Sequence, residues 1–532
     1  MTFDIVFEDA RIVDGTGSPW FRGAVAVDDG RIARIERETG VDIDAQTTVA
    51  VEGNVLAPGF IDTHSHSDLK LFADPLLKPK LRQGITTEIL GQDGFSIAPM
   101  YPEGGDTEWQ DHLGGLAGRV DRDWTWESFS DYLDAVEENG VAPNVASHVG
   151  HGTVRYNVMG MADRRPTDDE LDEMADLVTE ALEEGALGLS TGLIYTPCTY
   201  DDTPVLERLA SRLEPYGRPF VAHIRSEGRW IWDALDEFVD VGAEQSVPLH
   251  LSHFKVAGRK QHGKAGRAID LLETARERGV DITVEQYPYT AASTMLSSVL
   301  PPWVHVGGAE QVLEQIEEPE VRKRIRRDIT EWRIEGWENT AGLAGWDGIV
   351  VSNVESDANE HLEGRTVAEI ADERDASPVD AVCDLLLEEN LDVSMVLDLL
   401  AEDDVREILG YERVNACTDG LFGGSPHPRV HGTYPRILGH YVREENVLTL
   451  EEAIRKMTAL PARAMGLKRK GVLRPGMDAD LVVFDPEVVE SPATYENPKQ
   501  YPRGIPHVVV EGEPVVSDGE VTGRMPGRVI RK

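Results

Sequence analysis

The chain has 532 residues, of which 41% are hydrophobic, and its 96 acidic residues outnumber 52 basic residues to give a net charge of −44. The length is enough for one large and one smaller domain, and the hydrophobic content excludes a disordered chain. No apolar run approaches the roughly 18 residues that a membrane-spanning helix needs. So acidic a surface repels nucleic acids and anionic membranes, which excludes both as expected partners, and it favours adaptation to high internal salt (a halophilic protein).

The first 57 residues predict short β-strands in the segments DIVFED, RIVD, GAVAVDD and RIARIER. Asp29-Gly30 lies between two of these runs and is typical of a hairpin turn. No basic stretch precedes an apolar run at the start, so we expect no secretory signal and a cytoplasmic protein.

The next strand-like segment, VLAPGFIDTHSHSD at 55–68, carries His64 and His66. Residues two apart on a strand point to the same side, so the two imidazoles could bind one metal ion. An isolated His-x-His pair is more often a surface or core pair, and the metal hypothesis therefore depends on the rest of the chain.

The region 58–465 alternates strand-like runs with helical patterns. The segment 169–185 has helical spacing of its apolar residues and a stop at Gly185, while PFVAHIR, PLHLSHF, DITVEQYPY and RVNACTD are typical of strands. This alternation predicts an α/β fold, a (β/α)8 TIM-type barrel of parallel strands. The segment 295–348 fits the alternation poorly, and we interpret it as an insertion that forms a lid.

Three later strands carry a possible metal ligand near their C-terminal ends, where barrel enzymes place their chemistry. These ligands are His223, His253 and Asp419. Together with His64 and His66 they make a metal site the favoured interpretation over chance or core packing.

The segment 466–532 returns to β-rich sequence, with GVLRPGMDADLVVFDP and GIPHVVVEGEPVVSDGE. Both ends of the chain are therefore predicted to be β-structure around a barrel that occupies the middle.

Several motifs together resemble the amidohydrolase superfamily and, within it, the D-aminoacylase (N-acyl-D-amino-acid deacylase) family. The resemblance covers essentially the whole chain. Besides PGFIDTHSH, it is carried by LGQDGFSIAP at 90–99, VGHGTVR at 149–155, GALGLSTGLIYTP at 185–197, AHIRSEG at 222–228, LSHFK at 251–255, EQYPYTAAST at 285–294 and TDGLFGGSPHPRVHGTYPRILGHYV at 418–442.

The resemblance implies a (β/α)8 barrel at 58–465 with a small β-sandwich built from 1–57 and 466–532. It implies that His223 and His253 hold a tightly bound Zn2+, that His64 and His66 belong to a second, weaker metal position, and that Asp419 is the catalytic carboxylate. The expected reaction is hydrolysis of N-acyl-D-amino acids to a carboxylic acid and a free D-amino acid. Metal-activated hydroxide would attack, with Asp419 as general base and acid.

The sequence departs from this family at Asp93, where the relatives carry a zinc-binding cysteine. A carboxylate is a legitimate but harder zinc ligand, so Asp93 could bridge two metals or favour another metal, or it could simply be a turn residue before Gly94. None of the three cysteines, Cys198, Cys383 and Cys417, lies in this motif.

The substrate is expected to be a small N-acyl amino acid, whose carboxylate calls for cations. The resemblance supports Lys255 and Arg429 in this role. The further candidate contacts are Tyr195 as a pocket wall, Tyr287 and Ser293 as hydrogen-bond partners, and His151 at the carbonyl oxygen; packing or a structural hydrogen bond is the alternative for each.

Three other functions stay open from the sequence: a cyclic amidase of the dihydroorotase or hydantoinase type, a dipeptidase for D-configured peptides, and a non-catalytic scaffold with the same fold. The cyclic amidases usually use a modified lysine as a metal bridge, and no strand offers a clear lysine there. The oligomeric state is not predicted.

Overall fold

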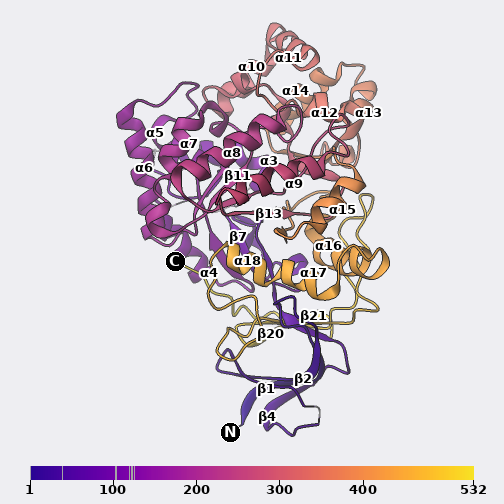
Figure 1. The fold of residues 1–532 in the computed structure, drawn as a ribbon. Coiled ribbons are helices and arrows are strands. Elements are labelled where there is room, and N and C mark those ends of the chain that lie inside the picture. The colour runs from indigo at the N-terminus through magenta and orange to yellow at the C-terminus, as the bar shows by residue number, and fades with distance from the viewer. Residues whose placement is uncertain (1, 39, 102–104, 119, 121–123, 125) are drawn as a thin grey trace.

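The two ends of the chain form one nine-stranded sheet. The computed structural model describes residues 2–38, 40–101, 105–118, 120, 124 and 126–532. The strands follow the order β21-β20-β19-β18-β5-β1-β2-β3, with β4 beside β1. Figure 1 shows the indigo N-terminal strands and the yellow C-terminal strands together at one end of the molecule. Their bounds are β1 Phe3–Ile12, β2 Phe21–Asp28, β3 Arg31–Glu36, β4 Ala45–Ala50, β5 Val55–Pro58, β18 Leu481–Phe484, β19 His507–Val510, β20 Glu513–Ser517 and β21 Glu520–Val521.

The predicted hairpin at Asp29-Gly30 is confirmed. Strands β2 and β3 pair antiparallel with Asp28 opposite Arg31. The two turn residues have φ angles of 49° and 70°, the left-handed conformation that Asp and Gly tolerate and that suits the twist of a two-residue hairpin.

The middle of the chain contains two sheets in which every pairing is parallel. One sheet has the order β6-β7-β8 and the other β17-β13-β12-β11-β10-β9. The sheets adjoin where β9 follows β8 and where a parallel bridge joins Ser65, after β6, to Gly420, after β17. The bounds are β6 Phe60–Asp62, β7 Ile85–Leu90, β8 Asn144–Ser147, β9 Val149–Gly150, β10 Leu189–Gly192, β11 Phe220–His223, β12 Leu249–Leu251, β13 Ile282–Gln286 and β17 Val414–Ala416.

Helices separate most of these strands along the chain, as parallel connections require. The predicted helix at 169–185 is α6, Asp168–Glu183, which begins with a capping box between Thr167 and Glu170 and buries Met174 and Leu177. The other helices here are α1 Lys70–Ala73, α2 Lys78–Leu81, α3 Gly105–Ala117, α4 Phe129–Asn139, α5 His151–Met159, α7 Thr203–Ala210, α8 Ile231–Gln245, α9 Ala265–Glu277, α15 Glu402–Gly410, α16 Arg429–Arg436, α17 Leu450–Met457 and α18 Ala459–Ala464.

The segment that departs from the parallel order runs from Ala291 to Asp398 and is longer than the predicted 295–348. It contains the antiparallel sheet β14-β16-β15 and helices at the upper end of the molecule in Figure 1. Its later part alternates helix and strand as the parallel region does, and hydrophobic periodicity does not reveal strand direction. The elements are β14 Ala291–Met295, α10 Ala309–Glu317, α11 Pro319–Glu331, α12 Thr340–Ala344, β15 Ile349–Val354, α13 Val367–Glu373, α14 Pro378–Glu388 and β16 Val393–Asp398.

The parallel strands lie in the interior: every residue of β6, β7, β8, β10 and β11 is buried. A buried ion-pair network stabilises the first of these strands, because Lys80 Nζ lies 2.7 Å from Asp62 Oδ2 and 2.6 Å from Glu88 Oε1. Among the described residues, no helix combines the length and the apolar character that crossing a membrane takes.

Candidate metal centre

All six predicted metal ligands meet in one buried cluster at the carboxyl ends of the parallel strands. Their side-chain ligand atoms form two groups, each with all atoms within 4.8 Å of one another. The first group is His64, His66, Asp93 and Asp419, and the second is Asp93, His223 and His253. Asp93 is the residue that the two groups share.

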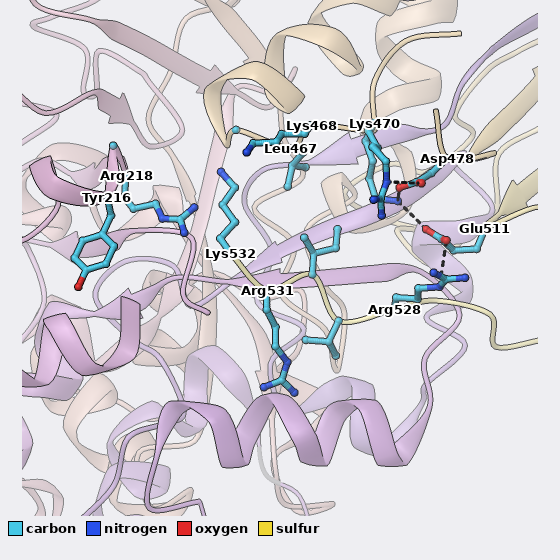
Figure 2. Close-up of a pocket in the computed structure, with 15 residues that line it drawn as sticks. Tyr216, Arg218, Leu467, Lys468, Lys470, Asp478, Glu511, Arg528, Arg531 and Lys532 are labelled. Atoms are coloured by element: carbon cyan, nitrogen blue, oxygen red, sulfur yellow. Dashed lines mark hydrogen bonds and ion pairs between the residues drawn. The ribbon is translucent and has the colours of Figure 1, made fainter. Parts of the chain in front are cut away.

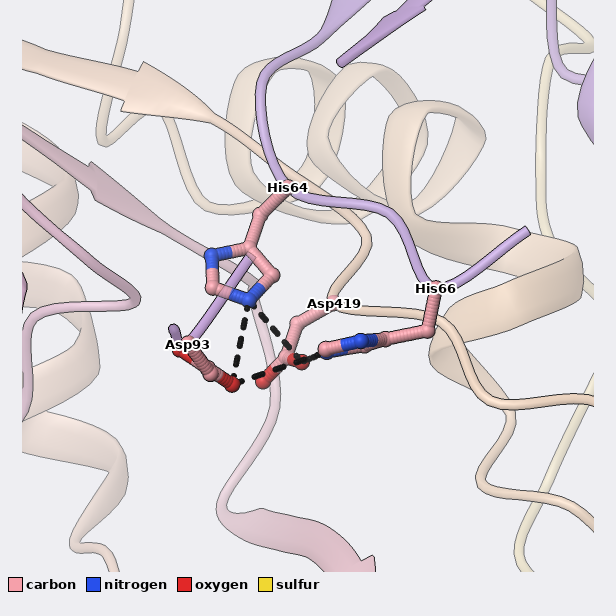
Figure 3. Close-up of side chains that lie close together, drawn as sticks. All are labelled: His64, His66, Asp93 and Asp419. Carbon is pink, nitrogen blue, oxygen red and sulfur yellow. Dashed lines mark hydrogen bonds and ion pairs between the residues drawn. The ribbon is translucent and has the colours of Figure 1, made fainter. Parts of the chain in front are cut away.

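The two carboxylate oxygens of Asp93 face different histidine pairs. Asp93 Oδ2 lies 3.5 Å from His64 Nε2 and 3.6 Å from His66 Nε2. Figure 3 draws both contacts as dashed lines. Asp93 Oδ1 lies 3.7 Å from His223 Nδ1 and 3.5 Å from His253 Nε2. The residue has a φ angle of 56°, a left-handed conformation that an Asp tolerates better than most residues. The turn geometry therefore aims the carboxylate between the two pairs.

The donor atoms fit divalent metal ions. Four buried atoms of the cluster have no hydrogen-bond partner among the described residues, which is costly unless something else binds them. They are His64 Nε2, both ring nitrogens of His223 and Asp93 Oδ1. Two ligands bound about 2.0–2.1 Å from one tetrahedral ion lie about 3.4 Å apart. The separations of 3.5–3.7 Å between Asp93 and the histidines are close to that spacing and too long for good hydrogen bonds.

Glu285 orients His64. Its Oε1 lies 2.6 Å from His64 Nδ1, and its Oε2 lies 3.0 Å from His250 Nε2. Burial would raise the pKa of Glu285, but His64 and His250 hold it below its ordinary value. The carboxylate can accept the Nδ1 hydrogen of His64, which leaves the Nε2 lone pair directed at the cluster. Sequence reasoning missed Glu285, although an acid inside a predicted strand of the barrel was a usable signal.

Glu227 has the equivalent position beside the second group. Its Oε1 lies 3.1 Å from His253 Nδ1 and 2.6 Å from Lys255 Nζ, which itself lies 2.7 Å from His253 Nδ1. Burial lowers the pKa of His223 to about 3, so this imidazole is neutral and able to bind a metal. Sequence reasoning missed Glu227 too, and it proposed Lys255 only as a substrate contact.

Asp419 lies between the first group and Arg429. Its Oδ1 is 3.2 Å from His66 Nε2, and its Oδ2 is 2.8 Å from Arg429 Nη1. Burial would raise the pKa of Asp419, but the Arg429 guanidinium and His64 hold it well below its usual range. Arg429 is fully buried, donates from Nη2 to the Ser293 carbonyl, and contacts Asp419 rather than lining the cavity.

The cavity in front of the cluster has a volume of about 30 Å³, enough for about one water molecule. Four of the residues proposed as substrate contacts line it: Tyr195, Tyr287, Ser293 and Lys255. The Tyr195 hydroxyl pairs with Thr294 Oγ1 at 2.8 Å, and the Tyr287 hydroxyl has no hydrogen-bond partner among the described residues. The remaining walls include apolar side chains and further residues of the insertion. These are Leu116, Ile194 and Leu399, with Leu397, Glu338 and Thr340 from the insertion.

The structure corrects the prediction for His151. Its Nδ1 lies 2.9 Å from Thr191 Oγ1 and its Nε2 lies 2.9 Å from Asp201 Oδ2, so both ring nitrogens are already bound. His151 is fully buried and does not line the cavity. The residue has a structural role, because Asp201 also pairs with Arg155 within this buried network.

Residues 47–516 match the model of the amidohydrolase family. A D-aminoacylase of Alcaligenes xylosoxydans xylosoxydans is 34% identical, over 100% of this chain and 98% of the relative. An N-acyl-D-glutamate deacylase of the same organism is 33% identical, over 99% of this chain and 96% of the relative.

Solved structures give the same result. A crystal structure of D-aminoacylase, described as defining a novel subset of amidohydrolases, superimposes with a TM-score of 0.83 at 32% identity over 100% of both chains. Another D-aminoacylase structure, from a study of its binuclear metal centre, has a TM-score of 0.84 at 32% identity and 100% coverage of both chains. The N-acyl-D-glutamate deacylase of Bordetella bronchiseptica, complexed with zinc and a phosphonate mimic of the tetrahedral intermediate, has a TM-score of 0.85 at 32% identity, again over 100% of both chains.

Proposed function

The chain belongs to the amidohydrolase family, and from this premise we propose that it removes the acyl group of N-acyl-D-amino acids by metal-dependent hydrolysis of the amide bond. The observation that carries the proposal is the buried cluster of four histidines and two aspartates in a chain that aligns over its full length with D-aminoacylases.

The cluster is suited to two divalent ions, for which zinc is the first candidate. His223 and His253 would hold one ion and His64 and His66 the other, with one oxygen of Asp93 on each. Ions bound here supply an acidified water and a polarised substrate carbonyl. Asp93 thus stands where relatives carry a zinc-binding cysteine, and its carboxylate has one oxygen for each of the two metal positions.

Asp419 moves the proton in this proposal. Its carboxylate accepts a proton from the attacking water and returns it to the amide nitrogen as the carbon–nitrogen bond breaks, so the amine leaves neutral. Arg429 holds Oδ2 at 2.8 Å and keeps the other oxygen, Oδ1, on the side of the metal ligands. Arg429 is therefore proposed to position Asp419, whereas Lys255, which lines the cavity, binds the substrate carboxylate.

The cavity walls favour a substrate with a neutral side chain. Leu116, Ile194, Leu397 and Leu399 provide an apolar surface, and Lys255 is the one basic side chain apart from histidine among the described residues that line the cavity. A carboxylate on the substrate side chain would find no second cation among the described lining residues and would be repelled by Glu338. The cavity of about 30 Å³ must also widen to admit any substrate, and the insertion that contributes Glu338 and Thr340 is the proposed lid.

We propose that the two parallel sheets form one (β/α)8 barrel over 58–465 and that 1–57 and 466–532 build a β-domain beside it. The supporting observations are the parallel pairings, the continuity of β8 and β9, and the Ser65–Gly420 bridge.

The function is tested by measuring amine release from N-acetyl-D-leucine, N-acetyl-L-leucine and N-acetyl-D-glutamate with zinc-loaded protein. We expect kcat/KM for the D-leucine derivative to exceed that for the L-derivative by at least 100-fold and that for the D-glutamate derivative by at least 10-fold. No release from any N-acyl-D-amino acid, or equal rates for both enantiomers, would contradict the proposal.

We also propose adaptation to high salt, because a net charge of −44 repels itself when it is not screened. The Tm should rise between low and multimolar KCl. An unchanged Tm would contradict the adaptation and leave the reaction unaffected.

A further inference from the structure

A second cavity, of about 660 Å³, lies at the end of the parallel strands opposite the metal cluster and shares no lining residue with the cavity there. Three separate segments meet around it: residues 216–218 just before β11, residues 466–470 after α18, and residues 528–532. The metal ligands follow the carboxyl ends of the same strands, so this cavity is far from the proposed chemistry.

Basic side chains dominate this cavity, although the whole chain carries a net charge of −44. Its lining includes seven basic and two acidic residues. Both acids already have partners, because Glu511 pairs with Lys470 at 2.9 Å and with Arg528 at 3.2 Å, and Asp478 pairs with Arg469 at 3.0 Å. The remaining basic side chains therefore carry the excess positive charge.

Three of these side chains, Arg218, Lys468 and Lys532, have no ion pair with any carboxylate in the part of the chain that the structure describes. Figure 2 shows them directed toward the same space. Arg218 Nε is buried without a hydrogen-bond partner among the described residues. Burial, with the nearby Arg218 and Lys468, lowers the pKa of Lys532 to about 8. The two acids of the lining pair with other basic residues, so these three cations are left for an external anion.

A smaller cavity of about 110 Å³ continues the site beneath the strands. It shares Gly217, Gly466 and Lys532 with the first cavity and adds two basic residues, Arg413 and Arg463, and one acid, Asp281, to its walls. Among the described residues, Arg413 Nε has no hydrogen-bond partner, like Arg218 Nε. Basic side chains therefore outnumber acidic ones along the amino ends of β11, β12, β13 and β17.

We propose that this cavity binds a phosphate-bearing anion, a di- or polyphosphate that is either free or part of a nucleotide. A multiply charged anion is required because several cations converge and a single carboxylate would neutralise only one of them. Arginine guanidinium groups match the geometry of phosphate oxygens, and about 660 Å³ is within the range of small-molecule sites. Lys468 is exposed and can follow the ligand, whereas Arg218 and Lys532 are half-buried, and Lys532 Nζ donates to the Met465 carbonyl.

Calorimetric titration of the full chain with pyrophosphate, ADP and adenosine, at one constant KCl concentration, tests the proposal. We expect saturable binding of one pyrophosphate or ADP per chain and none of adenosine. Equal affinities for pyrophosphate and ADP would assign the site to the phosphates alone, and at least 10-fold tighter ADP binding would assign it to a nucleotide. Both results support the phosphate site, and absence of saturable binding for both compounds would overturn it.

Two variants locate the binding. Lys468→Gln and Arg218→Gln should each weaken it by at least 10-fold without changing kcat on the N-acyl substrate, and Lys468 is exposed, so its loss leaves the fold intact. Arg524→Gln is the matched control, because Arg524 is an exposed arginine outside the cavity that pairs with Glu513. Phosphates also bind divalent ions, so the titration is repeated with Asp93→Ala. Unchanged affinity in Lys468→Gln and Arg218→Gln, or binding lost only in Asp93→Ala, would overturn the proposal.

Discussion

The two sides of the metal cluster differ in the partners that their ligand nitrogens have within the protein. On one side His66 Nε2 already lies 3.2 Å from Asp419 Oδ1, although His64 Nε2 has no hydrogen-bond partner among the described residues. On the other side neither ring nitrogen of His223 has a hydrogen-bond partner among those residues. An ion on the His64 side must displace the contact between His66 and Asp419, whereas an ion on the His223 side binds a nitrogen that has no such contact. The His223 side is therefore expected to bind its ion more tightly.

The largest expected effect comes from Asp419, the proton carrier on the His64 side. Asp419→Asn is nearly isosteric but cannot shuttle a proton, so kcat should fall by about 10³-fold or more with little change in KM. Steady-state kinetics on the zinc-loaded variant measures both constants.

Asp518→Asn is the control for this substitution, because Asp518 is exposed and has a φ of 52°, close to the 48° of Asp419. It should keep the wild-type kcat. If Asp419→Asn also kept a near-normal kcat, the general base would have to be another residue.

The next effect separates the two sides directly. His253→Ala should remove the tightly bound ion and lower kcat/KM by about 10²-fold or more, because metal chemistry supplies several kcal/mol of the barrier reduction. His66→Ala should remove the weaker ion and lower activity less. Metal content after exhaustive dialysis, measured by mass spectrometry, distinguishes the sides, and equal losses in the two variants would contradict their different affinities.

The sequence predicted that the candidate ligands lie together because each has a position set by local rules. His64 and His66 are two apart after a strand, and His223, His253 and Asp419 each end or follow a strand of the same parallel set. A parallel arrangement brings all these strand ends together, so the cluster follows from topology alone. The length of the insertion was not predictable in this way, because β15 and β16 differ from the parallel strands only in direction.

Side-chain partners were harder to predict than ligands. Lys255 lines the cavity, but its ion pair with Glu227 was not predicted. Arg429 was expected beside the substrate, and the structure places it behind Asp419. His151 lies in a motif that resembles the family, but its two ring nitrogens contact Thr191 and Asp201 instead of facing the cavity. Such pairings join residues far apart in sequence, and no periodicity encodes them.

The smallest expected effect concerns the carboxylates that orient the histidines. Glu285→Gln should weaken the ion on the His64 side by about 10- to 100-fold, because Glu285 fixes the tautomer of His64, and should leave the His223 side unchanged. Glu227→Gln should weaken the ion on the His223 side, because Glu227 contacts His253, and should leave the His64 side unchanged. Competition with a chelator measures each affinity, and a loss on both sides from either variant would show that the two sides are not independent.

The account depends most on Asp93 as the residue shared by both sides. Metal per chain in Asp93→Ala, measured after equilibration with zinc and removal of free ions, tests this directly. Since each carboxylate oxygen faces a different histidine pair, we predict that occupancy falls on both sides and that activity falls with it. Asp93→Cys should recover the tightly bound ion through the softer thiolate. Wild-type metal content in Asp93→Ala would contradict the shared-ligand assignment and leave Asp93 a turn residue.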